Sequence, residues 1–157
     1  MMQIAFDSPI LLPDLAATGA LAGRIAPLLG PGDMIALYGS LGAGKTAFAR
    51  ALIQLMTGDE SADIPSPTFT IVQTYEAVNG VAIWHVDLYR IERPRDISEL
   101  GLDDAFDEAV TIVEWPERLG NQLPVNHLAI HLTEIEHQTR RAEIRGHGTW
   151  ERRLAHG

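Results

Sequence analysis

The sequence predicts an α/β fold, a sheet with flanking helices to which antiparallel strands are added. Three observations predict it. The run IALYGSLGAGKTAFAR, residues 35–50, changes from strand-like to glycine-rich to helix-like. Two β-rich runs flank the pair Asn79-Gly80, which is the strongest short-range signal for a hairpin. Residues 127–146 contain two runs that alternate apolar and polar residues with period two, as antiparallel strands do.

The N-terminal part is expected to alternate strands and helices. Apolar runs and helical periodicity predict, in order, a strand over 2–6, a helix over 14–29, a strand over 33–38 and a helix over 45–57. A loop through Pro65 and Pro67 follows. The runs FTIVQTYEA and VAIWHVDLY, at 69–77 and 81–89, then form the expected hairpin.

The C-terminal part is expected to be mostly strands. The acidic stretch 95–109 predicts short helices around Leu100, Leu102 and Phe106, and its charges suit either a solvated face or a surface that meets a partner. VTIVEW, residues 110–115, is typical of a buried strand. The alternating runs at 127–136 and 139–146 predict an antiparallel pair.

The glycine-rich loop matches the pattern G-x-x-x-x-G-K-[ST] of a P-loop, so the expected sheet is of the P-loop NTPase type. Glycines let backbone N–H groups curl around phosphate oxygens, Lys45 reaches the β and γ phosphates, and the Thr46 hydroxyl is offered to Mg²⁺. The pattern therefore predicts a site for a nucleoside triphosphate and Mg²⁺. The loop residues expected to bind the nucleotide are Ser40, Leu41, Gly42, Ala43, Gly44, Lys45 and Thr46.

Lysine is used only once in this chain. Of its 12 basic residues, Lys45 is the only lysine. A compact ammonium fits between phosphates where a planar guanidinium does not, so this choice supports a working phosphate site.

Two acidic residues close apolar strands and are candidates for the metal site. Glu114 ends VTIVEW, and Asp87 ends AIWHVD with His85 two residues earlier on the same face. A P-loop needs a carboxylate at the end of a neighbouring buried strand, because the metal needs further oxygen ligands. One acid would meet the metal and the other would orient the attacking water; the spacing alone assigns neither role.

Composition limits the partners and the compartment. The 157 residues have the length of one domain, and the net charge of -9 argues against strong direct binding of nucleic acid, which normally requires a basic surface. The chain has no cysteine, which fits a reducing compartment such as the cytoplasm. The apolar stretch 10–29 is interrupted by Pro13, Asp14 and Arg24, so we expect an amphipathic helix and no membrane segment.

His127 and His131 have the spacing of metal ligands on a helix, but the alternation here predicts a strand. Leu128, Ile130 and Leu132 would form its buried face, and the two histidines would lie on the other face, roughly 13 Å apart. This spacing argues against a zinc site.

Four motifs, in this order and in a chain of this length, closely resemble the TsaE (YjeE) family: GSLGAGKT, SPTFTIV, HVDLYR and VEWPE. This family is the small ATPase of the bacterial system that installs threonylcarbamoyladenosine on tRNA. The resemblance implies slow ATP hydrolysis in support of the TsaD–TsaB complex, which acts next to the tRNA anticodon. The ATP cycle would reset that complex between rounds, and tRNA would be met only indirectly.

The resemblance also implies roles for individual residues. Glu114 and Thr46 would bind Mg²⁺, Asp87 would position water, and Thr68, in a switch segment at 66–70, would sense the γ phosphate. With Lys45, three of these residues, Asp87, Glu114 and Thr68, form the expected catalytic set.

Three further residues extend the expected nucleotide site. Trp115 follows the metal-binding acid, and either a place beside the nucleotide or a place in the core suits it. The family's pocket also draws on an N-terminal region and on an arginine of the late hairpin, here Thr18 and Arg140. No arginine finger can be picked out within the chain, so hydrolysis should be slow alone and dependent on a partner.

Two other classes of function compete with a regulatory ATPase. A small-molecule kinase also uses a short P-loop chain, but it needs an acceptor pocket and usually a lid that bears arginine. A module that binds nucleotide without hydrolysis has little use for two acids, Asp87 and Glu114, at the phosphate end.

Overall fold

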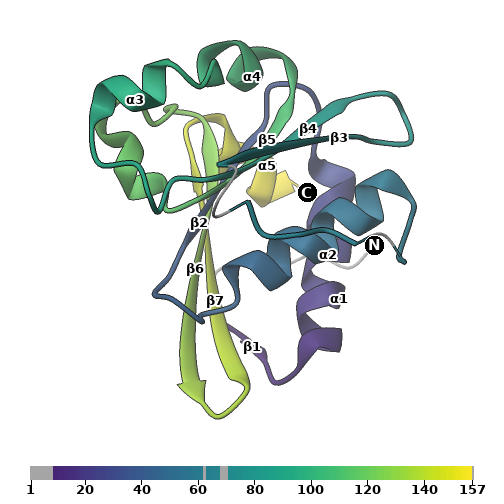
Figure 1. Cartoon of the computed structure of the whole chain (residues 1–157). Helices are drawn as coiled ribbons and strands as arrows, with labels where there is room; N and C mark the ends of the chain where they lie inside the picture. The colour runs from purple at the N-terminus through teal and green to yellow at the C-terminus, as the bar shows by residue number, and fades with distance from the viewer. Residues whose placement is uncertain (1–8, 62, 68–70, 157) are drawn as a thin grey trace.

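Seven strands form one mixed sheet in the computed structural model, which describes residues 9–61, 63–67 and 71–156 (Figure 1). Their order across the sheet is β1-β7-β6-β2-β5-β4-β3. Their bounds are β1 Ile10–Leu12, β2 Met34–Tyr38, β3 Val72–Glu76, β4 Ala82–Asp87, β5 Val110–Glu114, β6 His127–Glu136 and β7 Thr139–His147.

The centre of the sheet is parallel and its edges are antiparallel. β2 pairs in parallel with both β5 and β6, and β4 pairs in parallel with β5. β3, β7 and β1 are added antiparallel to β4, β6 and β7 respectively. This arrangement confirms the expected α/β sheet with added antiparallel strands. The central strands are buried on both faces, which explains the apolar run of β2 and the three apolar residues among the five of β5.

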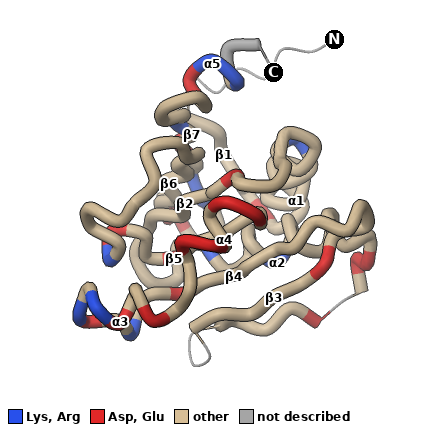
Figure 2. Tube along the Cα trace, turned by 90° about the horizontal axis from the view of Figure 1, so that it is seen from above, with Lys and Arg blue, Asp and Glu red and all other residues tan. Residues whose placement is uncertain are grey.

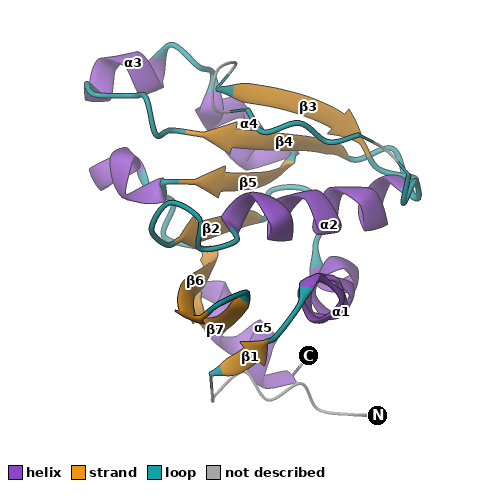
Figure 3. Ribbon diagram, turned by 60° about the horizontal axis from the view of Figure 1, so that its bottom comes forward, coloured by secondary structure: helices purple, strands orange, loops and turns teal. Residues whose placement is uncertain are grey.

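Helices cover both faces of the sheet, as Figure 3 shows. The helical segments are α1 Leu15–Ile25, α2 Lys45–Thr57, α3 Pro94–Ser98, α4 Leu102–Glu108 and α5 Thr149–His156, with 3₁₀ segments η1 Ala26–Leu28 and η2 Pro116–Gln122. One core cluster joins α1, α2 and Trp150 of α5 to one face. A second cluster joins α3, α4 and η2 to the other face.

Local sequence explains where the two long helices begin and end. The Asp14 side chain caps α1 by accepting a 2.9 Å hydrogen bond from the Ala17 N–H. The last part of the expected helix over 14–29 is 3₁₀, and it contains Pro27, which has no N–H for the helical ladder. α2 has the expected bounds and ends at Gly58, whose φ of 73° suits glycine.

Three elements were not expected from the sequence. β1 is only three residues long and exists by pairing with β7. The loop expected after Trp115 contains the 3₁₀ segment η2. α5 is polar, but Trp150 is 1% exposed and Arg153 pairs with Asp33 at 2.6 Å. The expected strand over 2–6 lies outside the described residues.

The late hairpin has the expected strands, but the first part of β6 is buried on both faces. Leu128, Ile130 and Leu132 are buried as expected, and so are His127 and Ala129. On the other face His127 stacks on His147 with ring centroids 4.4 Å apart, and His131 stacks on Tyr38 with centroids 4.5 Å apart. The two histidines of β6 therefore have separate partners.

The acidic stretch forms α3 and α4, and its apolar residues anchor it. Ile97, Leu102 and Ala105 are buried. The acidic residues of α4 are exposed, and Figure 2 shows their positions along the trace of that helix. Among the described residues, no helix combines the length and the apolar character needed to cross a membrane.

Candidate functional site

The topology brings three strand ends to one edge of the sheet. Glu114 of β5 lies beside Leu37 of β2 and beside Asp87 of β4 in the pairing register. Because these strands are parallel, their carboxyl ends meet beside the loop that leads into α2 (Figure 3). The P-loop and both candidate acids are thus neighbours, although up to 75 positions separate them in sequence (39 to 114).

The loop geometry requires glycine at two positions. Gly44 caps α2 with a φ of 102°, a left-handed conformation that side chains disfavour. A Cβ on Gly39, whose φ is 151°, would lie 2.7 Å from the Leu132 carbonyl oxygen. The loop therefore packs its backbone closely against β6 and starts α2 at a fixed place, where the helix N-terminus favours anions.

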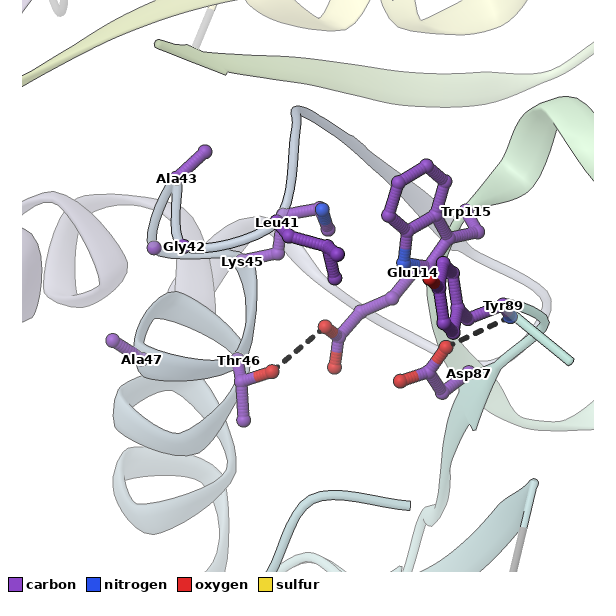
Figure 4. A pocket seen from close by; sticks show the side chains of 11 residues that line it. Leu41, Gly42, Ala43, Lys45, Thr46, Ala47, Asp87, Tyr89, Glu114 and Trp115 are labelled. Atoms are coloured by element: carbon purple, nitrogen blue, oxygen red, sulfur yellow. Dashed lines mark hydrogen bonds between the residues drawn. The ribbon is translucent and has the colours of Figure 1, made fainter. Parts of the chain in front are cut away.

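A cavity of about 290 Å³ lies between the loop and the two acids (Figure 4). It is lined by Leu41, Gly42, Ala43, Gly44, Lys45, Thr46, Ala47, Asp87, Tyr89, Glu114 and Trp115. The cavity therefore joins most of the site residues expected from the sequence. Ser40 is absent from the lining, and its carbonyl oxygen faces Lys45 instead.

Thr46 and Glu114 are in direct contact. The Thr46 hydroxyl donates a 2.8 Å hydrogen bond to Glu114 Oε1, and Figure 4 shows the two side chains pointing toward each other. Glu114 is 2% exposed, so its carboxylate depends on such bonds for stabilisation. A hydroxyl and a carboxylate are oxygen ligands that suit Mg²⁺.

The other oxygen of Glu114 is held by His85. His85 Nε2 lies 2.7 Å from Glu114 Oε2, and both side chains are buried. The sequence predicts that His85 lies on the same strand face as Asp87, but it does not predict the contact of His85 with Glu114. The contact depends on the parallel pairing of β4 with β5, which local periodicity does not specify.

Asp87 lies beside Glu114 and is 4% exposed. Its Oδ1 accepts a 3.0 Å hydrogen bond from the Tyr89 N–H, and its own N–H donates to the Ile71 carbonyl at 2.8 Å. The second bond ties the end of β4 to the segment that precedes β3. Thr68, the expected γ-phosphate sensor in that segment, lies outside the described residues.

Lys45 is buried against the loop and one aromatic ring. Its ammonium donates hydrogen bonds to the carbonyl oxygens of Gly39 and Ser40 and lies 4.1 Å from the centroid of the Trp115 ring. Burial lowers the pKa of Lys45, an effect opposed by nearby carboxylates, those of Glu114, Glu117 and Asp87. A cation held in this way is placed to meet phosphate oxygens.

Trp115 forms a wall of the cavity in a conformation that is uncommon for a bulky residue. Its φ is 60° and ψ is 49°, in the left-handed region. The ring also contacts Tyr89, with centroids 5.0 Å apart. Strain of this kind clusters at functional sites, and here it turns the indole toward Lys45. Trp115 also packs at the margin of the second core cluster, as the core expectation requires, and its place beside a nucleotide stays a prediction.

A second cavity, of about 560 Å³, lies where α1 begins and joins Thr18 to Arg140. Its lining comprises Leu12, Asp14, Leu15, Ala16, Thr18, Gly44, Ala47, Gln138 and Arg140. Two of these residues, Gly44 and Ala47, also line the first cavity, so both cavities border the N-terminus of α2. Nε and Nη1 of Arg140 are buried and have no hydrogen-bond partner among the described residues.

Comparison with known proteins identifies the family. Residues 12–142 match the sequence model of the family described as threonylcarbamoyl adenosine biosynthesis protein TsaE. The chain belongs to the TsaE family. The TsaE of Rickettsia conorii is 39% identical over 127 residues, which cover 81% of this chain and 71% of that protein. The TsaE of Mycobacterium tuberculosis is 33% identical over 83% of this chain and 81% of its own length.

A solved structure extends the comparison to the fold. The crystal structure of Bacillus subtilis YdiB superposes with a TM-score of 0.77 and is 28% identical, covering 95% of this chain and 91% of that one. The α/β fold expected from the sequence is thus confirmed. The matched range of the TsaE family includes every residue of the two cavities.

Sequence reasoning missed several contributors to the two cavities. Among them are the His85 contact, the Tyr89 wall, Ala47, and the parts of the second cavity formed by Leu12 and Gln138. Tyr89 follows Asp87 by two residues and Ala47 directly follows the P-loop pattern, so the spacing offered a signal for both. The others depend on pairings between distant segments.

Proposed function

We propose that this TsaE-family protein is an ATPase that acts as one P-loop domain over 1–157 and works for the TsaD–TsaB complex in threonylcarbamoyladenosine formation on tRNA. Its ATP cycle resets that complex between rounds. The single observation that supports hydrolysis most directly is the contact of Thr46 with buried Glu114 beside the Lys45 ammonium.

The residues present fit a magnesium nucleotide. Thr46 and Glu114 would hold Mg²⁺, since both offer oxygen atoms at the start of α2. Bound Mg²⁺ neutralises charge that develops on the phosphates. Lys45 and the N–H groups at the start of α2 would bind the β and γ phosphates.

Asp87 suits the task of orienting water. Its Oδ1 is fixed by the Tyr89 N–H, and its side chain lines the same cavity as Glu114. A carboxylate fixed in this way can accept a hydrogen bond from a water aligned with the γ phosphate. Asp87 also donates a backbone hydrogen bond to Ile71, which adjoins the segment expected to act as a switch. Loss of the γ phosphate beside Asp87 can therefore change the conformation of that segment.

The second cavity suits the adenosine end of the nucleotide. It borders the P-loop at Gly44, where the Arg140 side chain would lie 3.7 Å from an added Cβ. Arg140 and Thr18 would bind there. Thr18 is buried in α1, and its hydroxyl lies 3.4 Å from the Asp14 carbonyl oxygen.

The residues around the expected phosphate position favour slow ATP hydrolysis by the chain alone. None of the described residues that line the first cavity is an arginine. An arginine finger supplied by a partner accelerates phosphoryl transfer by about 10³–10⁵. The net charge of -9 fits docking on a protein complex, with tRNA bound by the partners, and the cytoplasm is the matching compartment.

The test is phosphate release from ATP by the purified chain, alone and with TsaD and TsaB of the same organism. Slow release that requires Mg²⁺ and rises when the partners are added is the expected result. Phosphate transfer to a small acceptor would instead support a kinase, and binding without release would support a nucleotide-dependent module. Either outcome contradicts the proposal.

A further inference from the structure

The Glu114 carboxylate is held at both of its oxygens by different residues. Oε1 accepts a 2.8 Å hydrogen bond from Thr46, and Oε2 lies 2.7 Å from His85 Nε2. An ionised carboxylate only accepts hydrogen bonds, so the hydrogen of this second contact belongs to Nε2. The His85 ring is therefore the donor that fixes Oε2.

His85 is an unusual choice for a purely structural position. It is 0% exposed on β4, between Gln73 of β3 and Ile112 of β5 in the pairing register. Its Nδ1 has no hydrogen-bond partner among the described residues. Burying a polar atom without a partner costs stability, so an apolar side chain would serve the fold better here. The one side-chain hydrogen bond that His85 makes within the described part of the chain ends on Glu114.

We propose that His85 is a positioning residue for the metal site: by holding Oε2 of Glu114, it leaves Oε1 alone to face Thr46 and Mg²⁺. The proposal rests on the proposed function. A free carboxylate turns about its terminal torsion and presents either oxygen, or both, to a metal. Partners that hold a ligating group from behind typically account for about 10–100-fold in metal affinity.

Two variants of equal charge separate this role from simple burial. In His85→Gln the side-chain amide nitrogen reaches the place of Nε2, whereas in His85→Asn it reaches only the place of Nδ1. Both replace the ring by a neutral amide. Only His85→Gln keeps a donor for Oε2.

The measurement is calorimetric binding of ATP, first in EDTA and then over a series of Mg²⁺ concentrations. For His85→Asn we expect the ATP affinity in EDTA to stay within about twofold of that of the unchanged protein. The Mg²⁺ concentration that gives half of the Mg²⁺-dependent gain in ATP affinity should be about tenfold higher. His85→Gln should need at most about threefold more Mg²⁺. Equal Mg²⁺ dependence in all three proteins, or an equal loss in EDTA and in Mg²⁺, overturns the positioning role. If the unchanged protein shows no Mg²⁺-dependent binding, the proposed function itself fails, and the inference fails with it.

A measurement on the unchanged protein covers the case in which a variant does not fold. Nitrogen-15 NMR of the imidazole reports which ring nitrogen carries the proton. The proposal requires a proton on Nε2 of His85, retained when Mg²⁺ and ATP are added, because Oε2 stays bonded to it. A bare Nε2 in either state overturns the proposal.

Discussion

The Thr46 hydroxyl and Glu114 Oε1 are 2.8 Å apart, although 68 positions separate them along the chain. The first residue begins α2 directly after the P-loop, and the second ends β5. The threonine of the P-loop pattern and the acid that ends an apolar strand thus lie together and form one site lined by oxygen atoms. The predictions below test that site residue by residue.

Replacing Glu114 by glutamine should separate nucleotide binding from hydrolysis. Glutamine preserves the shape of the side chain and an oxygen for Thr46, but it removes the negative charge that would hold Mg²⁺. We expect ATP binding in EDTA to be retained and phosphate release to fall about 100-fold or more. Full hydrolysis by Glu114→Gln would contradict the assigned role.

Replacing Asp87 by asparagine should impair the chemical step alone. The amide keeps an oxygen for the Tyr89 N–H but is a poor acceptor for a proton of water. We expect phosphate release to fall about 10²-fold, with ATP and Mg²⁺ affinity within about threefold of the unchanged protein. Single-turnover rates at saturating ATP check this, and an unchanged rate would remove Asp87 from the mechanism.

Replacing Lys45 should weaken the binding of ATP. The ammonium is the cation fixed against the loop, and hydrogen bonds to charged groups contribute about 1.5–3 kcal/mol each. Lys45→Met keeps a long side chain beside Trp115 without the charge, so it serves as the packing control for Lys45→Ala. Calorimetry should show both variants binding ATP at least about tenfold more weakly. Normal affinity in Lys45→Met would show that the charge is dispensable.

Arg140 and Arg141 form a matched pair for testing the second cavity. They are consecutive in β7 and therefore point to opposite faces, and only Arg140 lines the cavity. Arg140→Ala should lower the affinity for ATP and for ADP by about tenfold each, because both nucleotides share the adenosine end. Arg141→Ala should keep both affinities within about twofold of those of the unchanged protein. Equal effects of the two variants in binding assays would place the adenosine elsewhere.

The stack of His131 on Tyr38 should make the fold sensitive to acid. Burial lowers the pKa of His131 below 6.5, with Arg145 adding to the effect and Glu143 opposing it. As the pH falls below about 6.5, the unfolded chain takes up a proton that the folded chain resists, so stability is lost. His131→Phe preserves the ring stack without titrating. The melting temperature of His131→Phe should fall less between about pH 7 and about pH 5 than that of the unchanged protein. An equal fall would assign the acid sensitivity to another group. His127 is one such group, because burial also lowers its pKa.

Local signals were enough to predict most of the fold. The P-loop pattern with its flanking strand and helix, the Asn79-Gly80 hairpin and the alternation in β6 and β7 each depend on residues close in sequence. β1 and α5 were missed because they are stabilised by distant partners. β1 pairs with β7, and α5 is fixed by buried Trp150 and by the ion pair of Arg153 with Asp33.

The candidate site also combines features that local sequence predicts with features that depend on distant residues. The acids at the ends of apolar strands were identifiable from sequence, but spacing left open which of them meets the metal. The structure places Glu114, and not Asp87, in contact with the Thr46 hydroxyl. The hold of His85 on Glu114 follows from strand order, which no short pattern specifies.

The most direct test of the account is calorimetric titration of the purified chain with ATP in the presence and absence of Mg²⁺, with AMP as the comparison ligand. The account predicts one ATP per chain, tighter binding with Mg²⁺, and much weaker binding of AMP. AMP lacks the β and γ phosphates that Lys45 would bind and that the Mg²⁺ held by Thr46 and Glu114 would bridge to the protein. Equal affinity for ATP and AMP, or no effect of Mg²⁺ on ATP binding, would contradict it.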